Sequence, residues 1–166
     1  FSNLFAEMVN KLDISGNNRV SNETIKIYGD IKENKDYSEA DIDKILKNLF
    51  STGFFEDVKV TIKNNVLIIK LIEYPVVNQL ILVGEPSNKY KEQIKKLIKT
   101  KEKKPYIKSN ISKDIETIKK LYSSIGFNSS KVETKIKEID SFNVDLVFEI
   151  DKGNESKISS INFIGD

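Results

Sequence analysis

The feature that most constrains this chain is an internal repeat. A segment in which apolar residues alternate with others and which ends at a glycine occurs three times, at residues 9–16, 77–84 and 158–165. Alternation with a period of two is typical of a strand with one buried face, and the glycine suits a turn that needs a positive φ. Three copies of the same strand along the chain predict two small domains, residues 1–75 and 76–153, and the first strand of a third at residues 154–166.

A second repeated block lies between these strands. Residues 41–54 align without a gap with residues 114–127, and both copies end in Gly-Phe. Ser38 and Asp41 are spaced to form a capping box, and Gly53 stands where a helix commonly ends. The apolar residues in the first copy recur at helical spacing, which predicts a helix with one buried face; they are Ile42, Ile45, Leu46, Leu49 and Phe50.

The remaining segments complete the same order of elements in both units. A shorter helical segment precedes each of these helices, beginning near Ser21 in the first unit and near Pro86 in the second. Two strand-like runs follow each repeated helix, and a short polar turn separates them. These runs are residues 55–62 and 66–73, and residues 130–139 and 143–150.

This order predicts an α+β fold built from tandem β-α-α-β-β units. Each unit is expected to form a three-stranded mixed sheet, covered on one face by two helices. The last two strands form an antiparallel hairpin, whereas the first strand arrives by a helical crossover and so lies parallel to the last. The last strand is then central, which fits the apolar run at residues 66–69.

The first strand of the hairpin, which is the second strand of each unit, is then an edge with unpaired backbone N–H and C=O groups. An extended peptide could add to such an edge by main-chain hydrogen bonds, whatever its sequence. The alternative is a solvated edge that its own charges protect from pairing. The candidate peptide-binding residues are Asp57, Val58, Lys59, Val60 and Thr61 in the first unit, and Lys131, Val132, Glu133, Thr134, Lys135 and Ile136 in the second.

Composition argues against an enzyme. The chain has no histidine and no cysteine, so it lacks the usual general base, the commonest metal ligand and any disulfide. No aspartate-rich calcium loop is present, and we expect no metal site and no cofactor. No apolar run approaches the roughly 18 residues that a membrane helix needs. The first nine residues do not resemble a signal peptide, which suggests a mature or trimmed piece.

Three surface features have more than one interpretation. The lysine-rich residues 91–104 are a solvated helix face and loop, a contact for an acidic partner or lipid head groups, or a nucleic-acid contact, although few aromatic residues flank them. Arg19, the one arginine, is a docking residue or a turn residue with a local salt bridge. Four aromatic residues are predicted to face inward and to pack in the core: Tyr28, Phe50, Phe54 and Tyr122.

Several motifs resemble those of POTRA (polypeptide-transport-associated) domains in BamA-like outer-membrane assembly proteins. Residues 12–25 resemble the "GN.RV…TI" opening of a first POTRA domain, and residues 49–58 resemble its "LF.TG.FEDV" signature. Residues 73–75 match an "E.P" exit, while Tyr122 with residues 126–127 and residues 163–165 resemble parts of the next two domains. One departure is Gly84-Glu85-Pro86, which replaces the usual Gly-Asn turn.

The resemblance implies the periplasmic arm of an outer-membrane protein, whose membrane β-barrel anchor is not in this sequence. Such an arm receives unfolded outer-membrane protein segments and docks periplasmic chaperones and partner lipoproteins. Alternatives within the same fold are a two-partner secretion transporter and a division protein, although a division protein usually carries one such domain. A different class is a nucleic-acid-binding module, which salt-dependent retention on DNA or RNA would reveal. We expect no nucleic-acid partner. The third copy of the repeated strand, residues 157–164, has no helices of its own. It is expected to be disordered or to pair with a neighbouring molecule.

Overall fold

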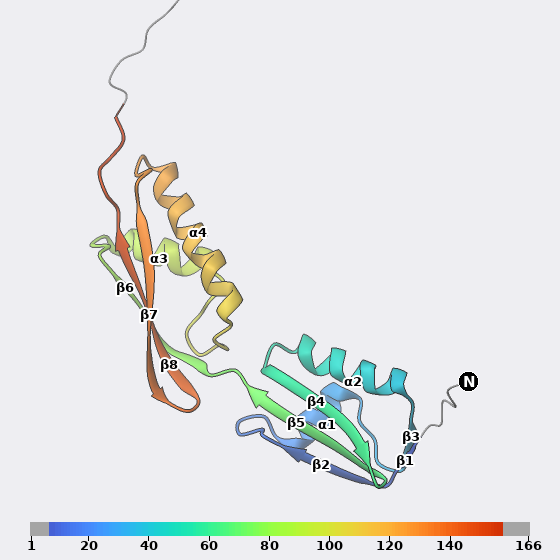
Figure 1. Cartoon of the computed structure of the whole chain (residues 1–166). Helices are drawn as coiled ribbons and strands as arrows, with labels where there is room; N and C mark the ends of the chain where they lie inside the picture. Colours follow the sequence, from blue (N-terminus) through green and yellow to red (C-terminus); the bar gives the residue numbers. More distant parts are fainter. Residues whose placement is uncertain (1–6, 158–166) are drawn as a thin grey trace, which may run out of the picture. The chain divides into compact units, whose positions relative to one another are not determined.

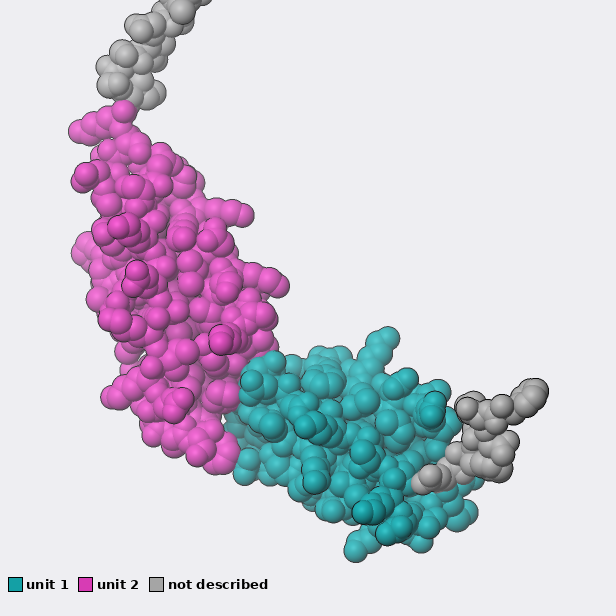
Figure 2. All heavy atoms as spheres, in the orientation of Figure 1, with its two compact units in different colours: residues 1–74 teal, residues 75–166 magenta. Residues whose placement is uncertain are grey.

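The chain divides into two compact units, Phe1–Tyr74 and Pro75–Asp166 (Figures 1 and 2). The computed structural model describes residues 7–157. Mixed α+β structure with one three-stranded mixed sheet in each unit confirms the predicted fold class. The third copy of the repeat, residues 158–165, lies outside the described residues. Between residues 7 and 157, no helix is long and apolar enough to span a lipid bilayer.

Unit 1 forms its sheet around the last strand, as its apolar run predicts. The order across the sheet is β2-β5-β4, with β5 parallel to β2 and antiparallel to β4. The hairpin turn is Asn64-Asn65, and both residues have positive φ, as a tight hairpin requires. The elements in chain order are β1 (Glu7–Val9), β2 (Lys11–Ser15), α1 (Asn22–Gly29), β3 (Lys35–Tyr37), α2 (Glu39–Ser51), β4 (Phe55–Lys63) and β5 (Val66–Glu73).

The predicted starts of both helices of unit 1 are confirmed. Ser21 caps α1 by accepting the Thr24 N–H. Ser38 caps α2 in a complete capping box, because its hydroxyl accepts from the Asp41 N–H and the Asp41 carboxylate accepts from the Ser38 N–H. Both helices bury their apolar stripes on one face of the sheet, in a core that includes Ile25, Ile45, Leu49, Leu67 and Ile69.

A small additional ribbon in unit 1 was not predicted. β3 lies between α1 and α2 in the chain, and β1 pairs antiparallel with it. The pair forms a separate two-stranded sheet in unit 1. The buried side chains of Val9 and Tyr37 join this ribbon to the core of unit 1. The predicted first strand at residues 9–16 is therefore two strands, and only β2 enters the main sheet.

Unit 2 repeats the arrangement with longer strands. Its sheet order is β6-β8-β7, with β8 parallel to β6 and antiparallel to β7. Ser87, one residue after the expected start at Pro86, caps α3 by accepting the Tyr90 N–H. The elements are β6 (Val76–Val83), α3 (Asn88–Leu97), α4 (Lys108–Ser124), β7 (Lys131–Asp140) and β8 (Asn143–Asp151).

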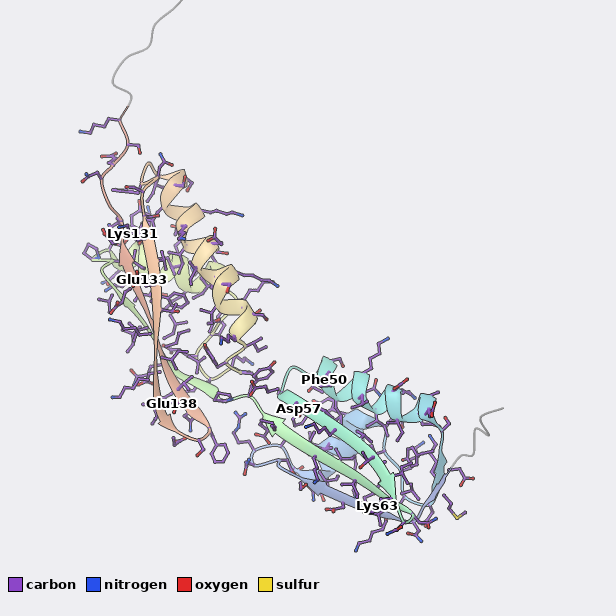
Figure 3. The ribbon with its side chains drawn as sticks, in the orientation of Figure 1. Phe50, Asp57, Lys63, Lys131, Glu133 and Glu138 are labelled. Carbon is purple, nitrogen blue, oxygen red and sulfur yellow. The ribbon has the colours of Figure 1, made fainter. Side chains whose placement is uncertain are left out.

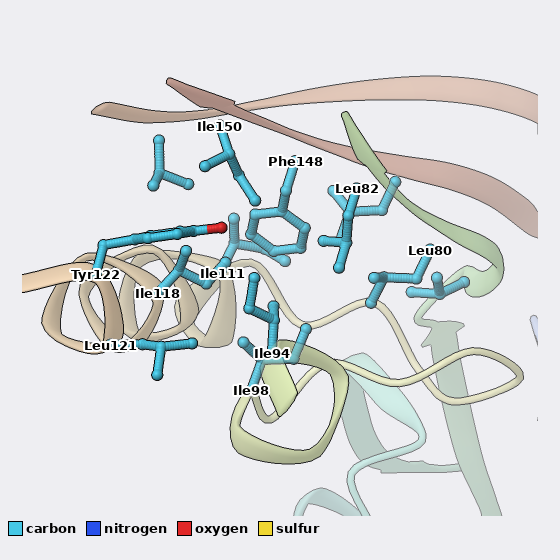
Figure 4. Close-up of a cluster of buried hydrophobic side chains, with 13 residues drawn as sticks. Leu80, Leu82, Ile94, Ile98, Ile111, Ile118, Leu121, Tyr122, Phe148 and Ile150 are labelled. Carbon is cyan, nitrogen blue, oxygen red and sulfur yellow. The ribbon is translucent and has the colours of Figure 1, made fainter. Parts of the chain in front are cut away.

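The core of unit 2 lies between its two helices and the central strand. Figure 4 shows side chains from α3, α4 and the sheet meeting there, with Tyr122 of α4 among them. Leu146 and Phe148 of β8 are fully buried. The Tyr122 ring is also fully buried, as predicted, and it packs edge to face against Phe127.

Two of the four aromatic predictions are wrong. Tyr28 of α1 is 48% exposed and Phe50 of α2 is 45% exposed. Phe50 lies on the edge of the apolar stripe of α2, and the residues of this helix that the core buries are Ile45 and Leu49. Phe54 is half-buried and packs against the core of unit 1, and its ring makes an edge-on contact with Tyr28.

Candidate functional site

Strands β4 and β7 are edges, as the order of elements predicts. β4 pairs only with β5, and β7 pairs only with β8, within residues 7–157. Each strand therefore presents one row of backbone donors and acceptors that its own sheet does not use. Both strands contain a register shift, between Phe55 and Asp57 in β4 and between Glu138 and Asp140 in β7. Bulges of this kind are common at sheet edges.

The candidate residues of unit 1 alternate between the two faces of β4. Val58 is buried and Val60 is half-buried, and both pack on the core beneath the helices. Lys59 and Thr61 are exposed on the opposite face, and Asp57 is half-buried. Figure 3 labels Asp57 and Lys63 near the two ends of β4. The backbone of this strand is therefore held in place by its apolar face.

The candidate residues of unit 2 alternate in the same way along β7. Val132 is buried and Thr134 is half-buried on the helix side, whereas Ile136 is 48% exposed. Lys131, Glu133 and Lys135 are exposed, and Figure 3 labels the first two along β7. The buried contacts of β7 thus end before its midpoint, and the second half of the strand extends past the core.

One ion pair involves a lysine of each edge strand. Lys59 Nζ lies 3.4 Å from the Asp57 carboxylate on β4. Lys135 Nζ lies 2.8 Å from Glu149 of the neighbouring strand β8. The hydrogen bond from Lys135 to Glu149, and the charge of that carboxylate, raise the pKa of the Lys135 ammonium group. Exposed ion pairs of this kind are weak, so they contribute little to holding either edge.

The opposite edges of the two sheets, β6 and β2, offer fewer free backbone groups for pairing. In unit 2 the loop between α3 and α4 covers the first half of β6: Val77 exchanges backbone hydrogen bonds with Lys103 and Lys104. The Leu80 N–H donates to the Glu102 carboxylate at 2.9 Å. In unit 1 the opposite edge is β2, which is only five residues long. The longest open edges in the described residues are therefore β4 and β7.

The structure decides between the two interpretations of Arg19. Its Nε lies 3.0 Å from the Glu73 carboxylate, and its Nη2 donates to the Tyr74 carbonyl at 2.6 Å. Arg19 is thus a turn residue with a local salt bridge. Part of the lysine run is also accounted for, because residues 101–104 form the loop that covers β6. Among residues 7–157, no cluster of three or more acidic side chains could hold a metal ion.

Both helices were predicted from the sequence, but their place beside the edge strands was not. The connection between α2 and β4 is only residues 52–54, so α2 runs back along β4, and Phe50 lies at the same end as Asp57 (Figure 3). The width of the apolar stripe on α2 could have indicated this, since Leu46 and Phe50 extend it beyond Ile45 and Leu49, which are the buried residues of the helix. No sequence signal indicates that Glu102 contacts the backbone of β6.

Comparison with known proteins places the fold in a family. The family model described as "POTRA: Surface antigen variable number repeat" matches residues 7–73 and residues 75–153. The two matches cover most of the chain.

Curated relatives agree with this match. The chain is 24% identical over 161 residues to the outer membrane protein assembly factor BamA of Neisseria meningitidis, covering 95% of this chain and 20% of that protein. It is 33% identical over 134 residues to the BamA of Buchnera aphidicola, covering 77% of this chain and 21% of that protein. The chain therefore spans about a fifth of the length of these relatives.

A solved structure shows the same fold. The N-terminal domain of Omp85 from Thermosynechococcus elongatus superposes with a TM-score of 0.55 at 14% identity, covering 88% of this chain and 63% of that chain. The order of elements, the central last strand and the family match lead to one conclusion: the chain belongs to the POTRA domain family, as two tandem domains of the kind found in BamA-like outer-membrane assembly factors.

Proposed function

We propose that this chain is a periplasmic receiving arm that binds unfolded outer-membrane protein segments by strand addition during β-barrel assembly. Its relatives are named as outer membrane protein assembly factors, which supports a role for this chain in that assembly. The observation that carries the mechanism is that β4 and β7 each pair on one side only. A client whose strands have not yet paired supplies the matching row of main-chain donors and acceptors.

The same edges suit a transient carrier. Main-chain pairing recognises every extended peptide, so one arm can serve clients of unrelated sequence. Ordering an unfolded segment costs conformational entropy, which keeps the affinity low and allows release to the next site. In this proposal, periplasmic chaperones and lipoproteins of the assembly complex are the protein partners, and no step requires catalysis or a cofactor.

NMR titration of the isotope-labelled chain with a peptide from an outer-membrane β-strand tests this function. We expect chemical-shift changes centred on β4 or β7, and slower hydrogen exchange at alternate amides of the same strand. Those amides face outward in the free chain and become hydrogen-bonded when a fourth strand is added.

The matched control is the same peptide carrying N-methyl groups at alternate residues. Methylation removes the donors along one edge of the peptide but leaves its side chains unchanged. Loss of binding on methylation supports main-chain pairing. Equal binding by both peptides, or shift changes confined to helix surfaces, contradicts strand addition.

A further inference from the structure

The helix beside β4 presents an apolar flank to the open edge. Lys44 Nζ bonds to Asp30 at 3.0 Å, which directs one flank of α2 toward the end of α1. The opposite flank carries Leu46 and Phe50 one turn apart, so this flank lies on the β4 side. Leu46 is half-buried and Phe50 is largely exposed.

β4 adds two apolar side chains beside this flank. Val60 and Ile62 point to the helix side of the sheet and are only half-buried. A strand added outside β4 would place every second side chain against Leu46, Phe50, Val60 and Ile62. We call these four residues the unit 1 groove. Together with the backbone row of β4, the groove suits an extended segment that alternates apolar and polar residues.

The equivalent groove in unit 2 is polar. Asp114 of α4 accepts the N–H groups of Lys99 and Thr100, which directs that flank of α4 toward the end of α3. The gap-free alignment of residues 41–54 with 114–127 then places Lys119 and Ser123 on the flank next to β7. Lys119 pairs with Glu116, and the Ser123 hydroxyl donates to Asn128 at 2.7 Å.

The edge strands differ in the same way, because β4 is more apolar than β7 at the equivalent positions. Val58 faces Leu71 in the unit 1 hairpin, and Val132 faces Ile150 in the unit 2 hairpin, so the two valines are equivalent. Two residues further along, Thr134 stands where unit 1 has Val60. Only Ile136 remains apolar among the four equivalent positions: Lys119, Ser123, Thr134 and Ile136.

We propose that the two edges divide the clients between them: β4 selects amphipathic strand segments whose apolar residues alternate, and β7 does not select for them. This inference rests on the proposed strand addition and adds a side-chain preference to it. Burial of alternate apolar side chains against the unit 1 groove supplies binding free energy that main-chain pairing alone lacks.

A pair of peptides with the same composition tests the preference. One alternates apolar and polar residues, and the other has its apolar residues in one block. In NMR titrations of the full chain, we expect the alternating peptide to bind β4 about tenfold more tightly than β7, the difference that one well-buried apolar side chain provides. The blocked peptide should bind both edges alike.

Exchanging the groove residues between units gives matched variants. Leu46→Lys with Phe50→Ser gives α2 the flank of α4, and should lower β4 affinity to the level of β7. Lys119→Leu with Ser123→Phe makes the reverse change, and should raise β7 affinity for the alternating peptide. The second variant alters partly or fully exposed positions of α4, so it also tests the proposal if the first one folds poorly.

The outcomes separate the two proposals. Binding of both peptides to both edges with equal affinity, unchanged by either exchange, overturns the division of clients but leaves strand addition intact. Absence of any shift change on β4 and β7 with every peptide overturns strand addition itself.

Discussion

Glu73 joins the end of unit 1 to the loop that follows its first strand. Its carboxylate accepts the backbone N–H groups of Asn18, Arg19 and Val20 at 2.8, 3.0 and 3.0 Å. The same carboxylate forms the salt bridge to Arg19, and its side chain is only 1% exposed. A charge in such a position is stable because each of its oxygens has a donor.

Unit 2 makes the equivalent contact with the charges reversed. The strand-end glycines Gly16 and Gly84 abut the carbonyls of Leu71 and Ile150, so Glu73 and Lys152 occupy equivalent places two residues later. Lys152 Nζ lies 3.3 Å from Glu85, which follows Gly84. An alignment by residue identity would not relate these pairs, because the acidic residue stands at the end of unit 1 (Glu73) but in the loop after the first strand of unit 2 (Glu85).

The ion pairs predict how stability depends on pH. Burial raises the pKa of Glu85, but the Tyr122 hydroxyl, the Ser87 N–H and Lys152 outweigh it, so the net pKa lies below the usual 4.5. The pKa of Glu73 is also lowered on balance. A carboxyl group with a lowered folded-state pKa stabilises the fold above its unfolded pKa, and that stability is lost as the pH falls through the folded value.

We therefore expect Glu85→Gln to destabilise the chain at pH 7 and to have a progressively smaller effect below about pH 4.5, the unfolded value. Urea unfolding at a series of pH values measures the difference between the two proteins. A difference that stays constant from pH 7 to pH 3 would show that the charge of Glu85 does not contribute.

The buried hydroxyl of Tyr122 makes a second residue-scale prediction. It donates to Glu85 at 2.5 Å in the core of unit 2. Tyr122→Phe leaves an acceptor of Glu85 without its donor and should lower the free energy of unfolding by about 1–3 kcal/mol. Tyr28→Phe is the control, because that exposed ring should change stability by less than about 0.5 kcal/mol. Equal effects in urea denaturation would contradict a stabilising role for the bond.

At the scale of elements, the end of the first strand in each unit depends on a glycine. Gly16 has a φ of 87°, and a Cβ there would collide with the Leu71 carbonyl of the central strand. Gly53 has a φ of 71°, but a Cβ there would meet no atom within 4 Å. A substitution at Gly53 therefore tests backbone strain alone, whereas a substitution at Gly16 tests backbone strain together with a steric collision.

Gly53→Ala should cost roughly 1–2 kcal/mol, the penalty for a side chain in the left-handed region. Gly16→Ala should cost clearly more, because β2 must also move away from β5. Denaturant midpoints of the two variants measure the contrast. Equal losses would mean that the pairing of β2 with β5 tolerates the displacement.

Elements with a local chemical signal were predictable from the sequence. The strand at residues 66–73 and the turn at Asn64-Asn65 are as expected, because apolar continuity and positive-φ residues act within a few positions. The capping box of Ser38 and Asp41 is equally local. These signals fix the topology, because a crossover connection leaves few ways to arrange three strands.

Features that depend on distant contacts were not predictable. β1 and β3 are three residues each, too short to show a period, and they form only because the chain brings them together. The exposure of Phe50 depends on which part of the apolar stripe of α2 the core contacts, and sequence periodicity does not report this. Main-chain edges could thus be predicted from the sequence, whereas the apolar groove beside β4 could not.

At the scale of the whole molecule, each unit has its own core. Residues of unit 1 alone form one buried cluster, and residues of unit 2 alone form the other. Leu67 of β5 and Leu146 of β8 are both fully buried on the central strand of their sheets. Each leucine therefore contributes to one cluster only.

Two matched substitutions test whether the cores act separately. Leu67→Ala and Leu146→Ala each leave a cavity, which should lower the stability of the affected unit by about 2–5 kcal/mol. Native-state hydrogen exchange then measures protection amide by amide. We expect Leu67→Ala to lower protection in β4 and β5 and to leave β7 and β8 unchanged, and Leu146→Ala to do the reverse. Loss of protection in both sheets from either substitution would show that the units unfold as one cooperative body, and a client added at one edge would then also stabilise the other unit.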